Sequence, residues 1–388
     1  MIPLVRLAWR HVAHHRGRAL LLAVVAGLVA LLPIAVQLVL SRIEAGLARR
    51  AEATPLVVGA HGSRFDLVLA ALYFRGTLAR ELAVRDCDRI AAAGLARVVP
   101  LHLRHSARAH PLVGTTIDYA RARGLALAAG SWPVMLGEVA LGAGVARELD
   151  LVAGDRILSD AKNLYDLAAP LPLRMSIVGV LGATDGPDDW AVFCELGTAH
   201  LLDGDLHGHD DAAGVGSEQL LARGEGSVAL DGSVIPYLEV RPEHAARFHA
   251  HGDRGAFALS AILAWPHDAK SGTLLKGRFA RDPVLELVVP KDVSRELLEL
   301  VVRAKRVLDA NLVLVGVAMV LLLALVVALS WRVRAAEVAT WLRMGVEPWR
   351  VRGLVALELA IPLGAGFAAA AGVAVAAVAW ATRSGWIE

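Results

Sequence analysis

Three uncharged apolar stretches restrict the fold of this chain more than any other feature. They cover residues 19–41, 310–330 and 359–382, and none of them contains Asp, Glu, Lys or Arg. At about 1.5 Å of rise per helical residue, each can cross a hydrocarbon core about 30 Å thick. The sequence is 56% hydrophobic, and the excess lies in these blocks. We therefore predict three transmembrane helices, over residues 19–41, 310–331 and 354–382.

The first apolar stretch follows a basic segment, residues 1–18, which we predict to be an interfacial helix. A basic start before an apolar core is also typical of a signal peptide. This core, however, exceeds twenty residues and ends at Arg42 without a small-x-small cleavage site, so we expect a retained span. Arginines crowd residues 1–18 and 332–353, which places both segments in the cytoplasm by the positive-inside rule, although Arg49 and Arg50 also follow the first span closely.

The segment between the first two spans, residues 42–291, then lies outside the cytoplasm and is long enough to bury a core of its own. β-prone stretches bounded by turn residues alternate with helical patterns such as residues 79–93. We predict a large mixed α/β extracytoplasmic domain. Its two cysteines, Cys87 and Cys194, can pair in an oxidising compartment or remain free buried thiols, and the sequence leaves both open.

One part of this domain suggests a metal site. Gly, Asp, Glu and His accumulate in residues 203–232, which we predict to be a flexible acidic loop. Within it, His207 and His209 are two positions apart and Asp210 follows. An extended chain would place both imidazoles on one side, where they can bind Zn²⁺. The competing interpretation is a mobile loop with incidental histidines.

The sequence offers no sign of catalysis or of nucleic-acid binding. It contains no Gly-Lys pair, so no phosphate-binding lysine of the Walker type is present, and we expect no ATP site in this chain. No nucleophile, base and acid can be assigned from their order. The formal net charge is only +2, which gives no argument for a nucleic-acid partner.

Two segments connect this domain and the later spans. Residues 292–309 predict a stalk helix that continues without a breaker into the second span. Residues 332–353 are a short arginine-rich connection in which Gly345 and Pro348 end a helix. A helix at a membrane face suits contact with a partner protein. The alternative is a solvated turn whose basic residues are held by anionic lipid.

The connection has a recognisable sequence. EVATWLRMGVEPWRVRGLVALE resembles the cytoplasmic loop of FtsX-like and MacB-like permeases of ABC transporters, whose pattern is close to R-x-x-E-[IV]-A-x-L-R-x-x-G-A. Leu342 stands where an arginine is usual, and Val346 replaces the usual alanine. VGAHGSRFDLVLAALY, EVALGAGVARELDLVAGDRILS and LRMSIVGVLGATDGPDDWAVFCEL resemble, in order, motifs of the MacB-like periplasmic core domain.

The resemblance implies a non-catalytic permease subunit in the bacterial inner membrane. ATP and Mg²⁺ would bind to a separate MacB-like or LolD-like ATPase, whose hydrolysis moves the extracytoplasmic domain to export or extract a substrate. The alternative is a membrane-anchored regulatory scaffold that controls an extracytoplasmic partner without transport. The residues expected to couple to the ATPase are Arg334, Glu337, Trp341, Arg343, Met344, Gly345, Trp349 and Arg350.

Further partners follow from the same resemblance. They are a second copy of the permease or a homologous permease, a periplasmic binding or adaptor protein, and membrane lipids. Such permeases normally carry a fourth span, whereas only a tail, residues 383–388, follows the third span here. A short family member, a fragment, or a last helix supplied by another subunit would each explain the difference.

Overall fold

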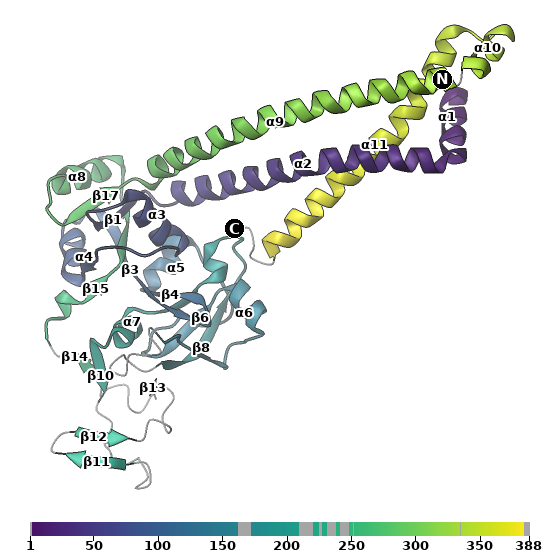
Figure 1. Ribbon diagram of the computed structural model, residues 1–388. Coiled ribbons are helices and arrows are strands. Elements are labelled where there is room, and N and C mark those ends of the chain that lie inside the picture. Colours follow the sequence, from purple (N-terminus) through teal and green to yellow (C-terminus); the bar gives the residue numbers. More distant parts are fainter. Residues whose placement is uncertain are drawn as a thin grey trace. The chain divides into compact units, whose positions relative to one another are not determined.

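The computed structural model describes residues 2–161, 172–208, 220–224, 227–230, 238–240, 248–250, 252–333 and 335–383. The chain divides into two compact units. A helical unit is built from Met1–Ala45 and Leu297–Ile387, and a sheet domain from Gly46–Glu296. Figure 1 shows the elements of both.

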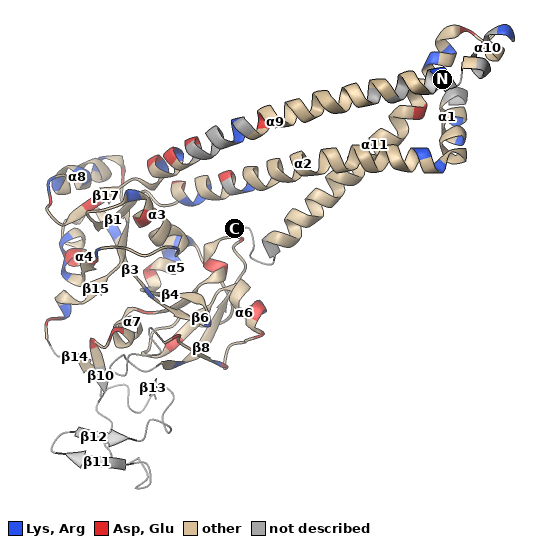
Figure 2. Ribbon diagram, viewed as in Figure 1, with Lys and Arg blue, Asp and Glu red and all other residues tan. Residues whose placement is uncertain are grey.

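The helical unit is formed by long helices. They are α1 (Ile2–His14), α2 (Arg16–Glu52), α9 (Pro290–Val333), α10 (Ala335–Arg343) and α11 (Pro348–Arg383), and the ends of α2 and α9 extend into the sheet domain. Helix α9 covers the predicted stalk and second span without a break. Figure 2 shows long sections of α2, α9 and α11 without charge, and basic residues on α1 and α10.

Two helices, over Arg16–Glu52 and Pro348–Ala381, are long and apolar enough to cross a membrane by length and composition. The apolar part of α9 identified in the same way, among the described residues, is the shorter stretch Leu308–Leu322. The topology with three spans therefore stays a prediction.

Small residues let α2 and α11 approach closely. A Cβ added at Gly366 of α11 would lie 2.2 Å from the carbonyl oxygen of Ala23, and one at Gly27 would lie 3.1 Å from the carbonyl oxygen of Gly366. At Gly364 and Gly372, which the same glycine-rich stretch contains, nothing lies within 4 Å of an added Cβ. Close helix contact therefore depends on Gly366 within this stretch.

The sheet domain has a mixed α/β fold, as predicted. Among the described residues, eleven strands form one sheet in the order β13-β8-β6-β9-β4-β3-β16-β1-β17, with β5 and β7 also paired to β8. These strands are β1 (Leu56–Ala60), β3 (Ala96–Ala107), β4 (His110–Thr115), β5 (Leu127–Gly130), β6 (Glu138–Leu141), β7 (Arg156–Leu158), β8 (Leu173–Leu181), β9 (Val192–Glu195), β13 (Leu238–Glu239), β16 (Ala261–Pro266) and β17 (Leu285–Val288).

Shorter elements complete the domain. The two-stranded pairs are β2 (Leu82–Ala83) with β15 (Ala258–Leu259), β10 (Leu206–Gly208) with β14 (Phe248–Ala250), and β11 (Leu220–Gly224) with β12 (Ser227–Leu230). The helices are α3 (Arg64–Tyr73), α4 (Val84–Ala91), α5 (Ile117–Arg123), α6 (Ala143–Leu149), α7 (Leu196–Asp203) and α8 (Ala269–Phe279), with 3₁₀ turns η1 (Pro187–Trp190) and η5 (Arg254–Ala256).

The core follows from alternation along the strands. In β8, Leu173, Met175 and Ile177 are buried, while the residues between them are partly or fully exposed. Such a period of two is what a strand with one covered face requires. Phe193 and Tyr119 are among the largest fully buried side chains and lie in one apolar cluster with Trp132.

Two sequence-based predictions need correction. Residues 79–93 are not one helix, because Leu82–Ala83 form β2 and α4 begins only at Val84. The Asp86 carboxylate accepts a hydrogen bond from the Ala83 amide (3.0 Å), which caps α4 at that point. Residues 203–232 are not a continuous loop either, since their described parts include β10, β11 and β12.

Candidate functional site

The arginine-rich connection begins as a helix that ends at a glycine. Gly345 has φ of 82°, a left-handed conformation that favours glycine. The Val346 amide donates a hydrogen bond to the Trp341 carbonyl (3.1 Å), and the Met344 amide donates to the Thr340 carbonyl (3.0 Å). This is the Schellman arrangement that satisfies the last carbonyls of a helix. The turn between α10 and α11 is therefore defined by backbone chemistry.

The turn exposes large apolar side chains. Met344 is 66% exposed and Trp349 is 59% exposed, whereas Trp341 is half-buried. Arg350 pairs with Glu347 at 2.7 Å, and its guanidinium carbon lies 5.3 Å from the centre of the Trp349 ring. The connection thus presents apolar groups beside charged ones, which suits a protein contact.

The structure describes only some of the remaining residues predicted to couple to the ATPase. Arg343 is exposed at the end of α10. Arg334 lies outside the described residues, and so does the side chain of Glu337.

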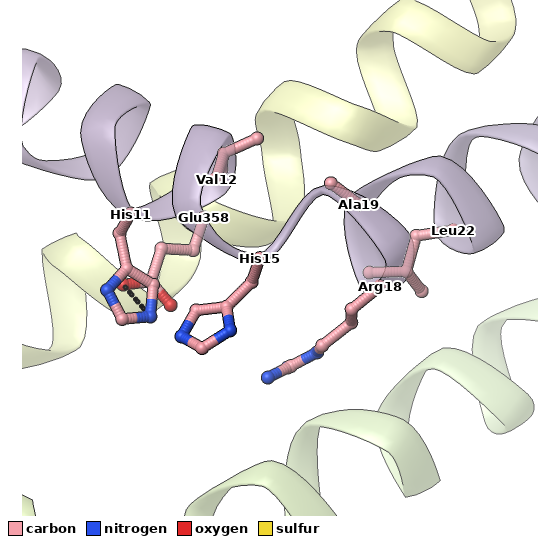
Figure 3. A pocket seen from close by; sticks show the side chains of 7 residues that line it. All are labelled: His11, Val12, His15, Arg18, Ala19, Leu22 and Glu358. Carbon is pink, nitrogen blue, oxygen red and sulfur yellow. Dashed lines mark ion pairs between the residues drawn. The ribbon is translucent and has the colours of Figure 1, made fainter.

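A polar pocket lies in the helical unit, between α1, the start of α2, and α11. Figure 3 shows His11 beside Glu358, with His15 next to it and Arg18 farther along. His11 Nε2 is 3.7 Å from Glu358 Oε1, and the Glu358 side chain is almost buried. The rings of His11 and His15 lie 4.6 Å apart, centre to centre. This cluster fixes α1 against the first turns of α11, directly after the exposed connection.

In the sheet domain, a buried ion pair anchors the end of α2. Arg50 donates to the two Asp188 oxygens at 2.6 and 3.1 Å, to the Tyr119 hydroxyl at 3.1 Å, and to the Leu72 carbonyl. The Tyr119 hydroxyl in turn donates to Asp188 (2.6 Å). Burial alone would raise the pKa of Asp188, but the Arg50 charge and the hydrogen bonds from Arg50 and Tyr119 outweigh burial and hold it below its ordinary value.

A second polar group in this domain gathers side chains that are distant in sequence. It consists of His102, His105, His200 and Asp203, and we call it the histidine cluster. Asp203 contacts His102 Nε2 at 2.6 Å and His105 Nε2 at 3.0 Å, and all four side chains are at most 5% exposed. Burial lowers the pKa of His200 to about 4, helped by His102 and His105 and opposed by Asp203, so its imidazole is neutral at pH 7.

The sequence did not reveal this cluster, because residues three apart in a regular strand lie on opposite faces. The register of β3 shifts between His102 and His105, as in a β-bulge, and the two rings stack with centres 5.5 Å apart and planes at 10°. His200 and Asp203 come from α7, where a spacing of three places them on one side.

The metal site predicted from the sequence is mostly outside the described structure. His207 belongs to β10, where it pairs in register with His249 of β14. His209 and Asp210 lie outside the described residues. Cys87 and Cys194 are both free thiols.

Comparison with known proteins gives similarity at the level of structure only. No protein-family model matches the chain, and no curated protein matches it. A search of solved structures finds the periplasmic region of MacB from Actinobacillus actinomycetemcomitans, with 10% identity, a TM-score of 0.37, and coverage of 65% of this chain and 97% of that one. It also finds the extracellular domain of YknZ, a noncanonic ABC-type transporter from Gram-positive bacteria, with 10% identity, a TM-score of 0.33, and coverage of 60% and 98%.

Proposed function

We propose that this chain is the permease subunit of an ABC transporter complex and transmits force instead of forming a channel. A separate ATP-binding subunit would move the connection between α9 and α11, and α9 would pass that motion to the sheet domain outside the membrane. The observation that carries the proposal is the continuity of α9. Its 44 residues form one helix about 66 Å long, from the end of the sheet to the connection.

The connection has the properties of a docking site for the ATP-binding subunit. Met344 and Trp349 can fill an apolar groove, and the exposed Arg343 can pair with a carboxylate at its rim. The Schellman turn at Gly345 keeps the link between α10 and α11 short, so a push on these side chains would act close to both helices.

A solute path through the described helices has little support. Polar residues are few in the predicted spans, and one of them, Gln37, donates a hydrogen bond to Asp309 of α9 (2.9 Å). A channel would need polar side chains facing a pore. This pairing favours force transmission, and it equally suits the second candidate, a membrane-anchored scaffold that switches an extracytoplasmic partner.

The docking proposal is tested by co-purification from native membranes in mild detergent. We expect an ATP-binding subunit to accompany the wild type and to fall at least about tenfold in the double variant Met344→Asp, Trp349→Asp, because two buried anchors of an interface are typically worth more than 1.4 kcal/mol. Val152→Asp is the matched control, since Val152 is 63% exposed but lies in the sheet domain. Equal recovery with the double variant would refute the docking site.

Transmission through α9 has its own test. Lys305→Pro breaks the helix between the sheet and the connection, whereas Lys305→Ala preserves it. We expect ATP with vanadate to change hydrogen exchange in the sheet domain of the wild-type complex and of Lys305→Ala, but not in Lys305→Pro, with the ATP-binding subunit retained in all three. An unchanged response in Lys305→Pro would refute transmission through this helix.

The two candidate functions differ in what accompanies the complex. A transporter should carry lipid or another small substrate that is released on ATP hydrolysis. A scaffold should instead retain a soluble extracytoplasmic protein whose activity changes with ATP, and that result would select the second candidate.

A further inference from the structure

The histidine cluster has the composition and spacing of a metal site. One nitrogen from each of His102 and His200 and one carboxylate oxygen of Asp203 all lie within 4.8 Å of one another. In a tetrahedral zinc site with bonds of about 2.0–2.2 Å, ligand atoms lie roughly 3.3 Å apart. Small side-chain rotations would therefore bring the three atoms around one ion.

Buried nitrogen atoms in the cluster have no hydrogen-bond partner. Among the described residues, neither ring nitrogen of His200 has a hydrogen-bond partner, and Nδ1 of His102 has none either. The His200 side chain is only 4% exposed, so little of it is open to bulk water that could hydrogen-bond to these nitrogens. Buried polar atoms normally have partners, and an ion bound by His200 would supply one.

The backbone around the cluster holds these side chains close together. A Cβ added at Gly114 of β4 would lie 2.5 Å from the Ala199 side chain and 3.2 Å from the His102 side chain. Glycine at this position therefore lets α7 settle against β3 and β4. The β-bulge in β3 then directs His102 and His105 toward the same helix.

We propose that the histidine cluster binds one Zn²⁺ ion, with His102, His200 and Asp203 as its protein ligands. His105 donates to the second oxygen of Asp203 and orients that carboxylate, as an outer contact of a metal ligand typically does. A water molecule takes the fourth position. The ion joins β3 to α7 and so clamps two elements that lie about a hundred residues apart in the chain.

The charges around the cluster are compatible with a divalent cation. Arg104 Nη1 lies 3.4 Å from Asp203, but Arg104 is 40% exposed and also pairs with Glu81 at 3.0 Å, so its charge is shared with a second carboxylate. Asp205 lies 3.6 Å from His200 Nδ1 and is 35% exposed. This carboxylate adds a second negative charge beside the cluster.

The proposal is tested on the full-length protein in detergent, purified through a tag without histidine and stripped with EDTA. Co²⁺ serves as the probe, because a tetrahedral Co²⁺ site absorbs visible light, and competition by Zn²⁺ then gives the zinc affinity. We expect one ion per chain. His200→Gln and Asp203→Asn should weaken binding by at least about 10- to 100-fold, the loss that follows removal of a contact even one step farther from the metal.

Matched controls separate this site from other histidines. His110→Gln alters a half-buried histidine on β4 that pairs with Glu148, and it should bind as the wild type does. The double variant His207→Gln, His209→Gln removes the pair predicted from the sequence, and it should also keep full affinity. Loss of binding in the double variant, with His200→Gln unaffected, would overturn the proposal.

A variant that gains an absorption band completes the test, because misfolding can explain a loss of binding but not a new band. His200→Cys replaces one ligand type by another, so a thiolate bound to Co²⁺ adds a charge-transfer band in the near ultraviolet. The band is expected with the histidine cluster as the site. Its absence, or a wild type that shows no visible Co²⁺ band and no rise of its urea midpoint with Zn²⁺, would refute the site.

Discussion

Replacing Asp188 with Asn is expected to destabilise the sheet domain by about 3–5 kcal/mol. The variant leaves Arg50 without its counter-charge at a site where the two side chains are only 10% and 4% exposed. Removing one partner of a buried ion pair costs this much because the remaining charge stays desolvated. With a urea m-value of about 2.5 kcal/mol per M, the midpoint of unfolding should fall by about 1–2 M.

The assay is pulse proteolysis in urea on the full-length protein in mild detergent, with the cleavage of the sheet domain followed. Asp118→Asn is the matched control, since Asp118 pairs with Arg121 at 3.3 Å but is 45% exposed. A surface pair is worth about 0.2–1 kcal/mol, so the control should shift the midpoint by less than about 0.4 M. Equal shifts for the two variants would refute the assignment of Asp188 to a buried pair.

A double-mutant cycle locates the energy in the pair. Arg50→Met removes the charge that Asp188→Asn leaves unpaired, so the double variant should lose clearly less than the sum of the two single losses. Additive losses would mean that Arg50 and Asp188 stabilise the domain independently, against the bidentate geometry observed.

The same variant has a defined dependence on pH. The pKa of Asp188 is lower in the folded protein than in the unfolded chain, so its contribution is present above the unfolded value of about 3.9 and is lost as pH falls through the folded value. The difference in midpoint between wild type and Asp188→Asn should therefore be constant from pH 8 to about 5 and shrink only below about 4. A difference that shrank near neutral pH would point to a different titrating group.

The remaining predictions concern helix packing and the thiols. Gly366→Val should lower the stability of the full chain in detergent by about 1–3 kcal/mol, because its Cβ would lie 2.2 Å from a backbone oxygen of α2. Gly364→Val is the control and should be tolerated, since nothing lies within 4 Å of a Cβ added there. Equal thermal unfolding of the two variants would contradict this packing. Burial, with the neighbouring Asp88 carboxylate, raises the pKa of Cys87 to about 12, and burial likewise raises that of Cys194, so neither thiol should react with maleimide at pH 8 before unfolding.

The sequence predicts the parts of this fold that depend on short-range patterns. Uncharged stretches and helical spacing indicated the long helices, and α9 extends over the predicted stalk and span as one element. The boundary errors have local causes. Residues 79–93 carry helical spacing, yet β2 pairs Leu82 with Leu259, a partner that no local pattern reveals.

Sites that join distant segments could not be predicted from the sequence. The histidine cluster needs a register shift in β3 and the packing of α7 beside Gly114, and neither can be read from the spacing of His102 and His105 alone. The Arg50 ion pair likewise joins residues 138 positions apart. In the sequence, Arg50 is recognisable only as a charge that closely follows the first predicted span.

The connectivity of the sheet domain joins the end of α2 to the start of α9. Helix α2 ends just before β1, and α9 begins just after β17; β1 and β17 are antiparallel neighbours, with Val57 opposite Val288. Lys291 and Glu52 add an ion pair between the two helix ends (3.0 Å), although both are exposed and the pair contributes little.

A displacement of the first turn of α9 must therefore either shear β17 from β1 or carry β1 and the end of α2 with it. Breaking several ladder hydrogen bonds costs more than moving the joined elements as one body, because each bond lost in the interior leaves polar groups without partners. The buried Arg50 pair extends this set of joined elements within the sheet domain from the end of α2 to Asp188 and Tyr119.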